Sequence, residues 1–119
     1  MRLAADEHAA VQARRFARRW MADQQVSAQV VDDIELVVGE LVTNAIRHGR
    51  PPYEVELHEV HGVIRGEVRD ASNTTPSPNP SPDHLGGFGL GIVAACTSRW
   101  GTAVLPVGKE VWFEVEPRT

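Results

Sequence analysis

The feature of this sequence that most constrains its fold is a pair of polar residues, Glu40 and Asn44, within a long and mostly apolar run from Ile34 to Ile46. Glu40 and Asn44 stand four positions apart, and residues at that spacing lie one above the other on the same face of a helix. A helix that is apolar on nearly every side is normally buried, where an unpaired polar group costs roughly 2 to 7 kcal/mol. The pair therefore needs a polar partner. A bound ligand and a structural hydrogen-bond partner both satisfy this need, and the pair alone does not decide between them.

Length and composition predict one domain over residues 1–119, large enough to enclose a single core. The formal net charge of −4 argues against general attraction to nucleic acid or to an anionic membrane. The sequence has no apolar signal core, and no stretch reaches the roughly 18 uninterrupted apolar residues that a membrane span needs. We therefore expect a cytoplasmic protein, and the single cysteine, Cys96, which has no partner for an internal disulfide, fits a reducing compartment without proving it.

Hydrophobic periodicity predicts three helices. The first covers about residues 7–22, with an apolar stripe flanked by arginines that favour local ion pairs over a partner-binding patch. The second is capped by Ser27, contains the Glu40/Asn44 pair, and runs to about Arg47, where Gly49 and Pro51-Pro52 stop it. The third covers about residues 90–98.

Alternating residues predict two antiparallel hairpins. The first pairs Tyr53–Val60 with Val63–Asp70 around a turn at His61-Gly62 and has at least one solvated side. The second pairs residues 99–105 with residues 110–116. The predicted fold is α/β (α+β), a two-layer sandwich in which a mixed, mainly antiparallel sheet is covered on one face by about three helices.

Two further patterns are weak when taken alone. His58 and His61 are spaced like a metal-binding pair, but no third ligand accompanies them. Residues 71–85 contain four prolines and form a long loop, typical of a functional lid or of disorder, and glycines follow at 86, 87, 89 and 91. Glycines before a helix let backbone N–H groups approach a phosphate, although they also occur at ordinary loop–helix junctions. Neither a dinucleotide-binding fold nor a P-loop fits, because their other signature residues are missing.

The order of three elements is more specific than any one of them. The residues concerned are Glu40, Asn44 and His48 with Gly49 on a helix, Asp70 at a strand end, and Gly87, Gly89, Leu90 and Gly91 opening a later helix. Over about residues 5–116 this order resembles the Bergerat (GHKL) ATP-binding fold of gyrase-type ATPases, Hsp90 chaperones, histidine kinases and MutL proteins. Within that superfamily the chain most resembles stand-alone anti-sigma-factor serine/threonine kinases, in its small size, its run Glu40–Gly49 and its ending Val111–Glu114.

The resemblance implies ATP and Mg²⁺ as cofactors and gives each site residue a role. Asn44 would coordinate Mg²⁺, which prefers oxygen ligands, and Glu40 would orient or deprotonate the attacking hydroxyl or water. Asp70 would accept a hydrogen bond from the exocyclic amine of adenine. Among the remaining positions of the motif, His48 belongs to the same helix, and Gly87, Gly89, Leu90 and Gly91 would form the lid over the phosphates.

Two departures from the family pattern affect the expected activity. The family often has Asp-x-Gly-x-Gly after the first hairpin, whereas this chain has Asp70-Ala71-Ser72-Asn73, so the backbone there is less free to approach a nucleotide. In the last hairpin, where a threonine is expected beside the aspartate, Lys109 is followed by Glu110. If Glu110 faces Asp70, the two carboxylates repel and weaken ATP binding; otherwise Glu110 points to solvent.

The resemblance implies a serine/threonine protein kinase that acts by partner switching, binding a sigma factor in one state and phosphorylating an anti-sigma-factor antagonist in another. The alternative is a nucleotide-dependent binding module that sequesters a regulatory partner without transferring phosphate. A detached histidine-kinase catalytic domain ranks third, because no phospho-accepting helix pair precedes it. Such kinases often form homodimers through an edge strand, and Arg2-Leu3-Ala4 leaves little of that strand.

Overall fold

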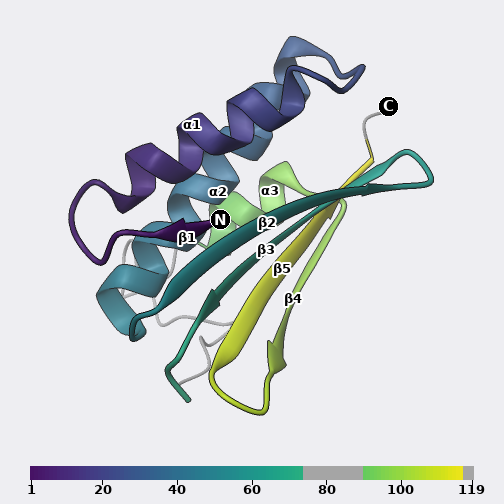
Figure 1. Cartoon of the computed structure of the whole chain (residues 1–119). Helices are drawn as coiled ribbons and strands as arrows, with labels where there is room; N and C mark the ends of the chain where they lie inside the picture. Colours follow the sequence, from purple (N-terminus) through teal and green to yellow (C-terminus); the bar gives the residue numbers. More distant parts are fainter. Residues whose placement is uncertain (74–89, 117–119) are drawn as a thin grey trace.

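Three helices cover one face of a five-stranded sheet in the computed structural model, which describes residues 1–73 and 90–116 (Figure 1). The helices are α1 (Ala9–Met21), α2 (Ala28–His48) and α3 (Leu90–Cys96). The strands are β1 (Arg2–Leu3), β2 (Tyr53–Val60), β3 (Val63–Asp70), β4 (Arg99–Val104) and β5 (Lys109–Val115), in the spatial order β1-β2-β3-β5-β4. The predicted α+β sandwich is confirmed. The sheet was predicted to be mixed and mainly antiparallel, and every described strand pair is antiparallel.

The long helix α2 organises the helical layer. The Ser27 hydroxyl accepts a hydrogen bond from the Val30 N–H at 3.2 Å, which is the predicted N-terminal cap. At the other end the Gly49 N–H donates to the Ala45 carbonyl at 2.8 Å. The core of the domain is formed largely by side chains of α2 that have no solvent exposure: Ile34, Val37, Val38 and Val42.

Small residues allow α1 to lie close against α2. Ala9, Ala13 and Ala17 are fully buried on one stripe of α1. Arg18, on the flank of that stripe, donates to Glu35 at 2.7 Å and to Asp32 at 3.3 Å, both on α2. The interpretation of an arginine flank with local ion pairs is confirmed for Arg18.

The turn between β2 and β3 has the predicted position. His61 and Gly62 both adopt left-handed backbone conformations, with φ of 53° and 82°. Two consecutive residues of this kind form the tight turn whose twist matches that of the flanking strands. The turn therefore sets the register in which Glu54 pairs with Arg69 and Val60 with Val63.

The sheet face away from the helices carries alternating charges rather than apolar side chains. Arg69 pairs with Glu56 at 2.9 Å, Glu67 at 2.6 Å and Glu110 at 3.0 Å, and so connects three neighbouring strands. Hydrogen bonding, first to Glu56, holds the pKa of the Arg69 guanidinium above its ordinary value. This network keeps the outer face polar, as the predicted solvated side of the hairpin requires.

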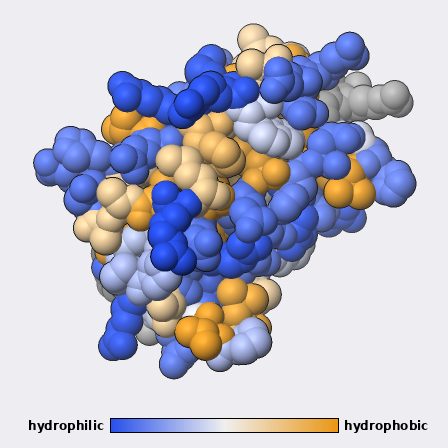
Figure 2. Space-filling view, in the orientation of Figure 1, coloured by the Kyte–Doolittle hydropathy of each residue, from blue (hydrophilic) through white to orange (hydrophobic). Residues whose placement is uncertain are grey.

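Hydrophilic residues cover much of the face shown in Figure 2, with apolar residues among them in its upper half, and a small apolar group lies at its lower end. In Figure 1 this end is the turn between β4 and β5. Val104 and Val107 there are 79% and 78% exposed.

Among the described residues, no helix has both the length and the apolar character that crossing a membrane requires.

Gly66 in β3 provides a test of the packing between the sheet and its core. A Cβ atom at this position would overlap the ring of Phe113, which is fully buried on β5. We expect Gly66→Ala to lower the free energy of unfolding by about 1–3 kcal/mol, as overpacking of a core does. Urea denaturation measures the change. Val60→Ala, at a half-exposed position of β2, is the matched control, and equal effects of the two substitutions would contradict this account.

Candidate functional site

A small cavity lies between α2 and the inner face of β3 and β5, beside the first residue of α3. Its volume is about 20 Å³, which is room for about one water molecule. Its lining residues come from four elements that are far apart in the sequence: Leu41, Asn44, Ala45, His48, Val68, Asp70, Leu90, Lys109 and Val111. The structure thus brings together four residues that the sequence had singled out, Asn44, His48, Asp70 and Leu90.

Asp70 lies at the end of β3 and is only 6% exposed. Its Oδ1 accepts hydrogen bonds from the Ser72 N–H at 2.7 Å and from the Arg50 N–H at 3.4 Å. Gly49 allows the chain after α2 to come this close, because a Cβ there would lie 2.6 Å from Oδ2 of Asp70. One carboxylate oxygen therefore caps neighbouring backbone, and the other is turned toward Gly49 and β5.

Lys109, the first residue of β5, completes the surroundings of Asp70. Its Nζ is 2.9 Å from Oδ2 and 3.3 Å from Oδ1 of Asp70, and the lysine residue is only 5% exposed. The register of the sheet pairs the two residues directly. Gly108 makes this register possible, since it has a φ of +87° and a Cβ there would overlap the Asp70 backbone.

This ion pair is not among the predictions from the sequence, although the alternation of residues along β5 indicates it. Lys109 shares the inner face of β5 with Val111 and Phe113, all three being buried. Alternation counted back from Phe113 would have placed Lys109, and not Glu110, on the side of the helices. The antiparallel register of β3 and β5 would then have set it opposite Asp70.

Glu110 neither faces Asp70 nor points to solvent, so both alternatives considered for it are wrong. It lies on the outer face of the sheet, is 8% exposed, and accepts a hydrogen bond from Nε of Arg69 at 3.0 Å. Arg65 is a second cation at 3.6 Å. The repulsion between two carboxylates that was expected to weaken nucleotide binding therefore does not arise.

Asn44 and Glu40 have different surroundings despite their common helix face. Asn44 is 9% exposed and lines the cavity. Glu40, one turn earlier, is half-buried, is not among the residues lining this cavity, and has no hydrogen-bond or ion-pair partner within the described part of the chain. Only one of the two polar residues thus reaches the cavity, whereas the sequence predicted a space shared by both.

Burial and nearby charges affect two titratable groups around the site. Burial lowers the pKa of His48, and the cations Arg47 and Lys109 lower it further. Burial raises the pKa of Tyr53, with a smaller contribution from the Asp70 carboxylate. His48 therefore adds no positive charge to the cavity wall at neutral pH, so that Lys109 is the cation that lines it.

Part of the predicted lid lies outside the described residues. This applies to Gly87 and Gly89 and to residues 74–85 of the proline-rich loop. Leu90, which begins α3, is 3% exposed and borders the cavity. A Cβ added to Gly91 would meet no atom within 4 Å, so packing within the described structure does not require glycine there.

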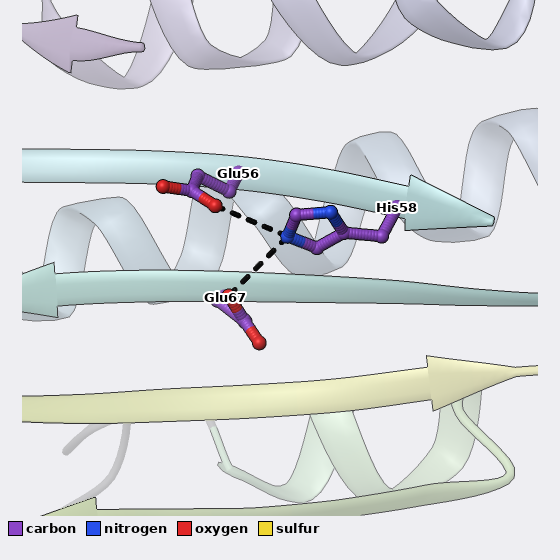
Figure 3. Close-up of side chains that lie close together, drawn as sticks. All are labelled: Glu56, His58 and Glu67. Atoms are coloured by element: carbon purple, nitrogen blue, oxygen red, sulfur yellow. Dashed lines mark ion pairs between the residues drawn. The ribbon is translucent and has the colours of Figure 1, made fainter. Parts of the chain in front are cut away.

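A second cluster of titratable residues lies on the outer face of the sheet (Figure 3). Nε2 of His58 is 3.1 Å from Glu56 and 3.4 Å from Glu67, so the companions of His58 are two glutamates and not His61. Arg69 already binds the same Oε1 of Glu67 at 2.6 Å. Because a metal ion would compete with this guanidinium, the cluster is best described as part of the ion-pair network.

Comparison with known proteins identifies the class of this fold and site. The model of the histidine kinase-like ATPase domain family matches residues 3–114, nearly the whole chain. The chain therefore belongs to the histidine kinase-like ATPase domain family. A comparison with curated proteins gives no significant match.

Solved structures show the same fold at low sequence identity. The structure of the RsbU and RsbW domains of Rv1364c from Mycobacterium tuberculosis superposes with a TM-score of 0.76 at 21% identity, covering 98% of this chain and 31% of that one. The catalytic domain of histidine kinase ThkA gives 0.65 at 18% identity, covering 90% and 91%. The histidine kinase domain of the blue-light activated kinase EL346 from Erythrobacter litoralis gives 0.59 at 20% identity, covering 75% and 48%. This chain thus spans less than a third of the first of these structures.

The electrostatics of the cavity wall can be measured through His48. Removing a neighbouring cation in Arg47→Ala is expected to raise the pKa of His48 toward its ordinary value, because one cause of its depression is lost. Titration of the imidazole signals by NMR measures the shift. Arg15→Ala removes an exposed arginine of α1 and serves as the control. A pKa of His48 that stays the same or falls in Arg47→Ala would contradict the described surroundings.

Proposed function

We propose that this chain binds Mg-ATP at the cavity beside α2 and transfers phosphate to a serine or threonine of a partner protein. The observation that carries this proposal is the meeting of Asn44 and Asp70, from α2 and β3, at one cavity closed by the start of α3. In an ATPase-domain family, a buried acceptor and a buried amide at one cavity are suited to the base and to the phosphate–metal end of a nucleotide.

The residues present fit Mg²⁺ and ATP in their chemistry. Asn44 offers a neutral oxygen ligand, and Mg²⁺ usually keeps several waters and binds substrate phosphates besides one or two protein oxygens. Asp70 offers a buried carboxylate acceptor, which suits an exocyclic amine such as that of adenine. When bound, Mg-ATP supplies the phosphoryl group and neutralises part of its charge.

Glu40 is proposed as the residue that handles the proton of the acceptor hydroxyl. Its carboxylate is half-buried on α2, one turn before Asn44, and none of the described residues holds it. A carboxylate in such a place can orient a serine hydroxyl and accept its proton as the oxygen attacks. Asn44 and Asp70 would meanwhile fix the nucleotide, so that positioning supplies most of the catalysis.

The proposed partners are a sigma factor and an anti-sigma-factor antagonist, exchanged by partner switching. The proposal is supported by the similarity to a structure that contains an RsbW domain, which aligns over nearly the whole of this chain. It is also supported by the resemblance of Glu40–Gly49 and Val111–Glu114 to stand-alone kinases of this kind.

A nucleotide-dependent binding module is the second candidate, and one specific observation favours it. The Lys109 ammonium occupies Oδ2 of Asp70, which reduces the ability of this carboxylate to bind a base. A chain with weakened nucleotide binding can still sequester a partner while transferring phosphate slowly or not at all.

Asn44→Ala tests the binding site. We expect at least a tenfold loss of Mg-dependent ATP affinity, or about 1.4 kcal/mol, because the variant lacks the proposed metal ligand. Isothermal titration calorimetry with Mg-ATP, repeated with EDTA, measures the loss. Thr43→Ala changes the adjacent position of α2, which does not line the cavity, and serves as the matched control. Unchanged binding by a folded Asn44→Ala variant would exclude the proposed metal ligand.

Glu40→Ala separates the kinase from the binding module. With radiolabelled ATP and purified candidate antagonists, we expect wild-type protein to label a serine or threonine, and Glu40→Ala to do so about 10²–10⁴-fold more slowly at similar ATP affinity. Asp32→Ala removes an exposed acid of the same helix and should keep the wild-type rate. Binding of ATP without labelling of any antagonist by wild type would favour the binding module.

A further inference from the structure

We propose that Lys109 is a gate of the nucleotide site, because its ammonium holds the carboxylate oxygen that a nucleotide base would use and has to leave before the base binds. The inference rests on the proposed ATP-binding function and adds a form of regulation to it. In this structure the ion pair between Lys109 and Asp70 opposes the binding of a nucleotide base.

The two oxygens of Asp70 have unequal access. Oδ1 is occupied by the N–H groups of Ser72 and Arg50, which belong to backbone on either side of the strand end. Oδ2 is 2.9 Å from Lys109 Nζ, and on its other side Gly49 is so near that a Cβ would stand 2.6 Å away. Lys109 Nζ contacts both oxygens of Asp70, at 2.9 Å and 3.3 Å, and so holds Oδ2, the oxygen to which no described backbone N–H donates.

The space around the pair leads to the same conclusion. The cavity of about 20 Å³ accommodates about one water molecule and no purine ring. The side chains of Lys109 and Asp70 are 6% and 4% exposed, so both are part of the cavity wall. A nucleotide base would have to displace side chains of this wall in order to bind. Movement of Lys109 would vacate the acceptor and enlarge the cavity in one step.

Lys109 lies next to an exposed turn. It is the first residue of β5, directly after a turn in which Val107 is 78% exposed. The Leu105 N–H donates to the Gly108 carbonyl at 3.0 Å and holds this turn together without using the Lys109 side chain. A change of side-chain rotamer could thus carry the ammonium from Asp70 to solvent while the strand stays in place.

The pair is expected to stabilise the nucleotide-free form. A buried carboxylate that loses its cation is strongly unfavourable unless another donor replaces it. A base amine would be such a donor. Only molecules that present an N–H group to Asp70 would then open the gate, and triphosphate alone would not.

The composition of the chain makes Lys109 directly measurable, since it is the only lysine. Its Nζ and the amino group of Met1 are therefore the only primary amines. We propose to acetylate wild-type protein with an N-hydroxysuccinimide ester and to follow both sites by mass spectrometry, with and without saturating Mg-ATP. Acetylation of Lys109 should be slow without nucleotide and about tenfold or more faster with it, while that of Met1 stays constant.

Lys109→Thr supplies an independent readout. Removing the competing ammonium should tighten ATP binding by about tenfold, as measured by calorimetry, although it also removes a cation that would attract the phosphates. Arg99→Thr removes an exposed cation of β4 and is the matched control for net charge, with no gain in affinity expected. Circular dichroism establishes that each variant is folded, and if Lys109→Thr does not fold, the acetylation rates of the wild type decide.

The outcomes separate the gate from the proposed function. If wild type binds ATP while Lys109 becomes no more reactive, or if Lys109→Thr binds more weakly, the gate is overturned and ATP binding stands. In that case Lys109 would be a residue that contacts the nucleotide. If neither folded protein binds Mg-ATP, the proposed function is overturned and the gate with it.

Discussion

The carboxylate of Asp70 connects three segments of the chain at one end of the sheet. It accepts hydrogen bonds from Arg50 after α2 and from Ser72 after β3, and it pairs with Lys109 at the start of β5. Because an isolated buried carboxylate is very unfavourable, these contacts are a condition for placing it there at all. These contacts also require glycine at positions 49 and 108, because a side chain at either position would collide with Asp70. The position of the cavity wall therefore depends on one charge and two glycines.

Charge also specifies how β3 and β5 pair. Neighbouring positions form ion pairs on opposite faces of the sheet, Arg69 with Glu110 outside and Asp70 with Lys109 inside. A slip of one residue would exchange the faces and bring each charge into the wrong environment. The same pairing holds Glu110 away from the cavity. The outer network and the inner site are thus two results of one register, although they have no residue in common.

The sequence predicted the elements of this fold well because their signals are local. The apolar periodicity of α2, the Ser27 cap and the His61-Gly62 turn all depend on residues close together in the chain, and the structure has each of them where it was expected. The surroundings of Asp70 depend instead on register between β3 and β5, which are separated by nearly 40 residues. For this reason Glu110 was placed wrongly and the partner of Asp70 was missed. Glu40 shows the same limit, because helix periodicity gives the face of a residue but not the depth of the cavity beside it.

The ion pair at Asp70 also sets a balance between stability and binding. In a site that depends on a buried acceptor, the nucleotide-free protein has to satisfy that acceptor with its own atoms, and Lys109 does so with a full charge. A neutral partner such as threonine would satisfy it less strongly and would be easier to share with a base. The lysine therefore favours a domain that stays folded without nucleotide, and in the proposed site it would lower the affinity for nucleotide. If the proposed function holds, such a domain would respond to ATP only where the gain from the phosphates and the metal exceeds the loss of this pair. Occupancy of the site would then be sensitive to anything that changes the position of the β4–β5 turn.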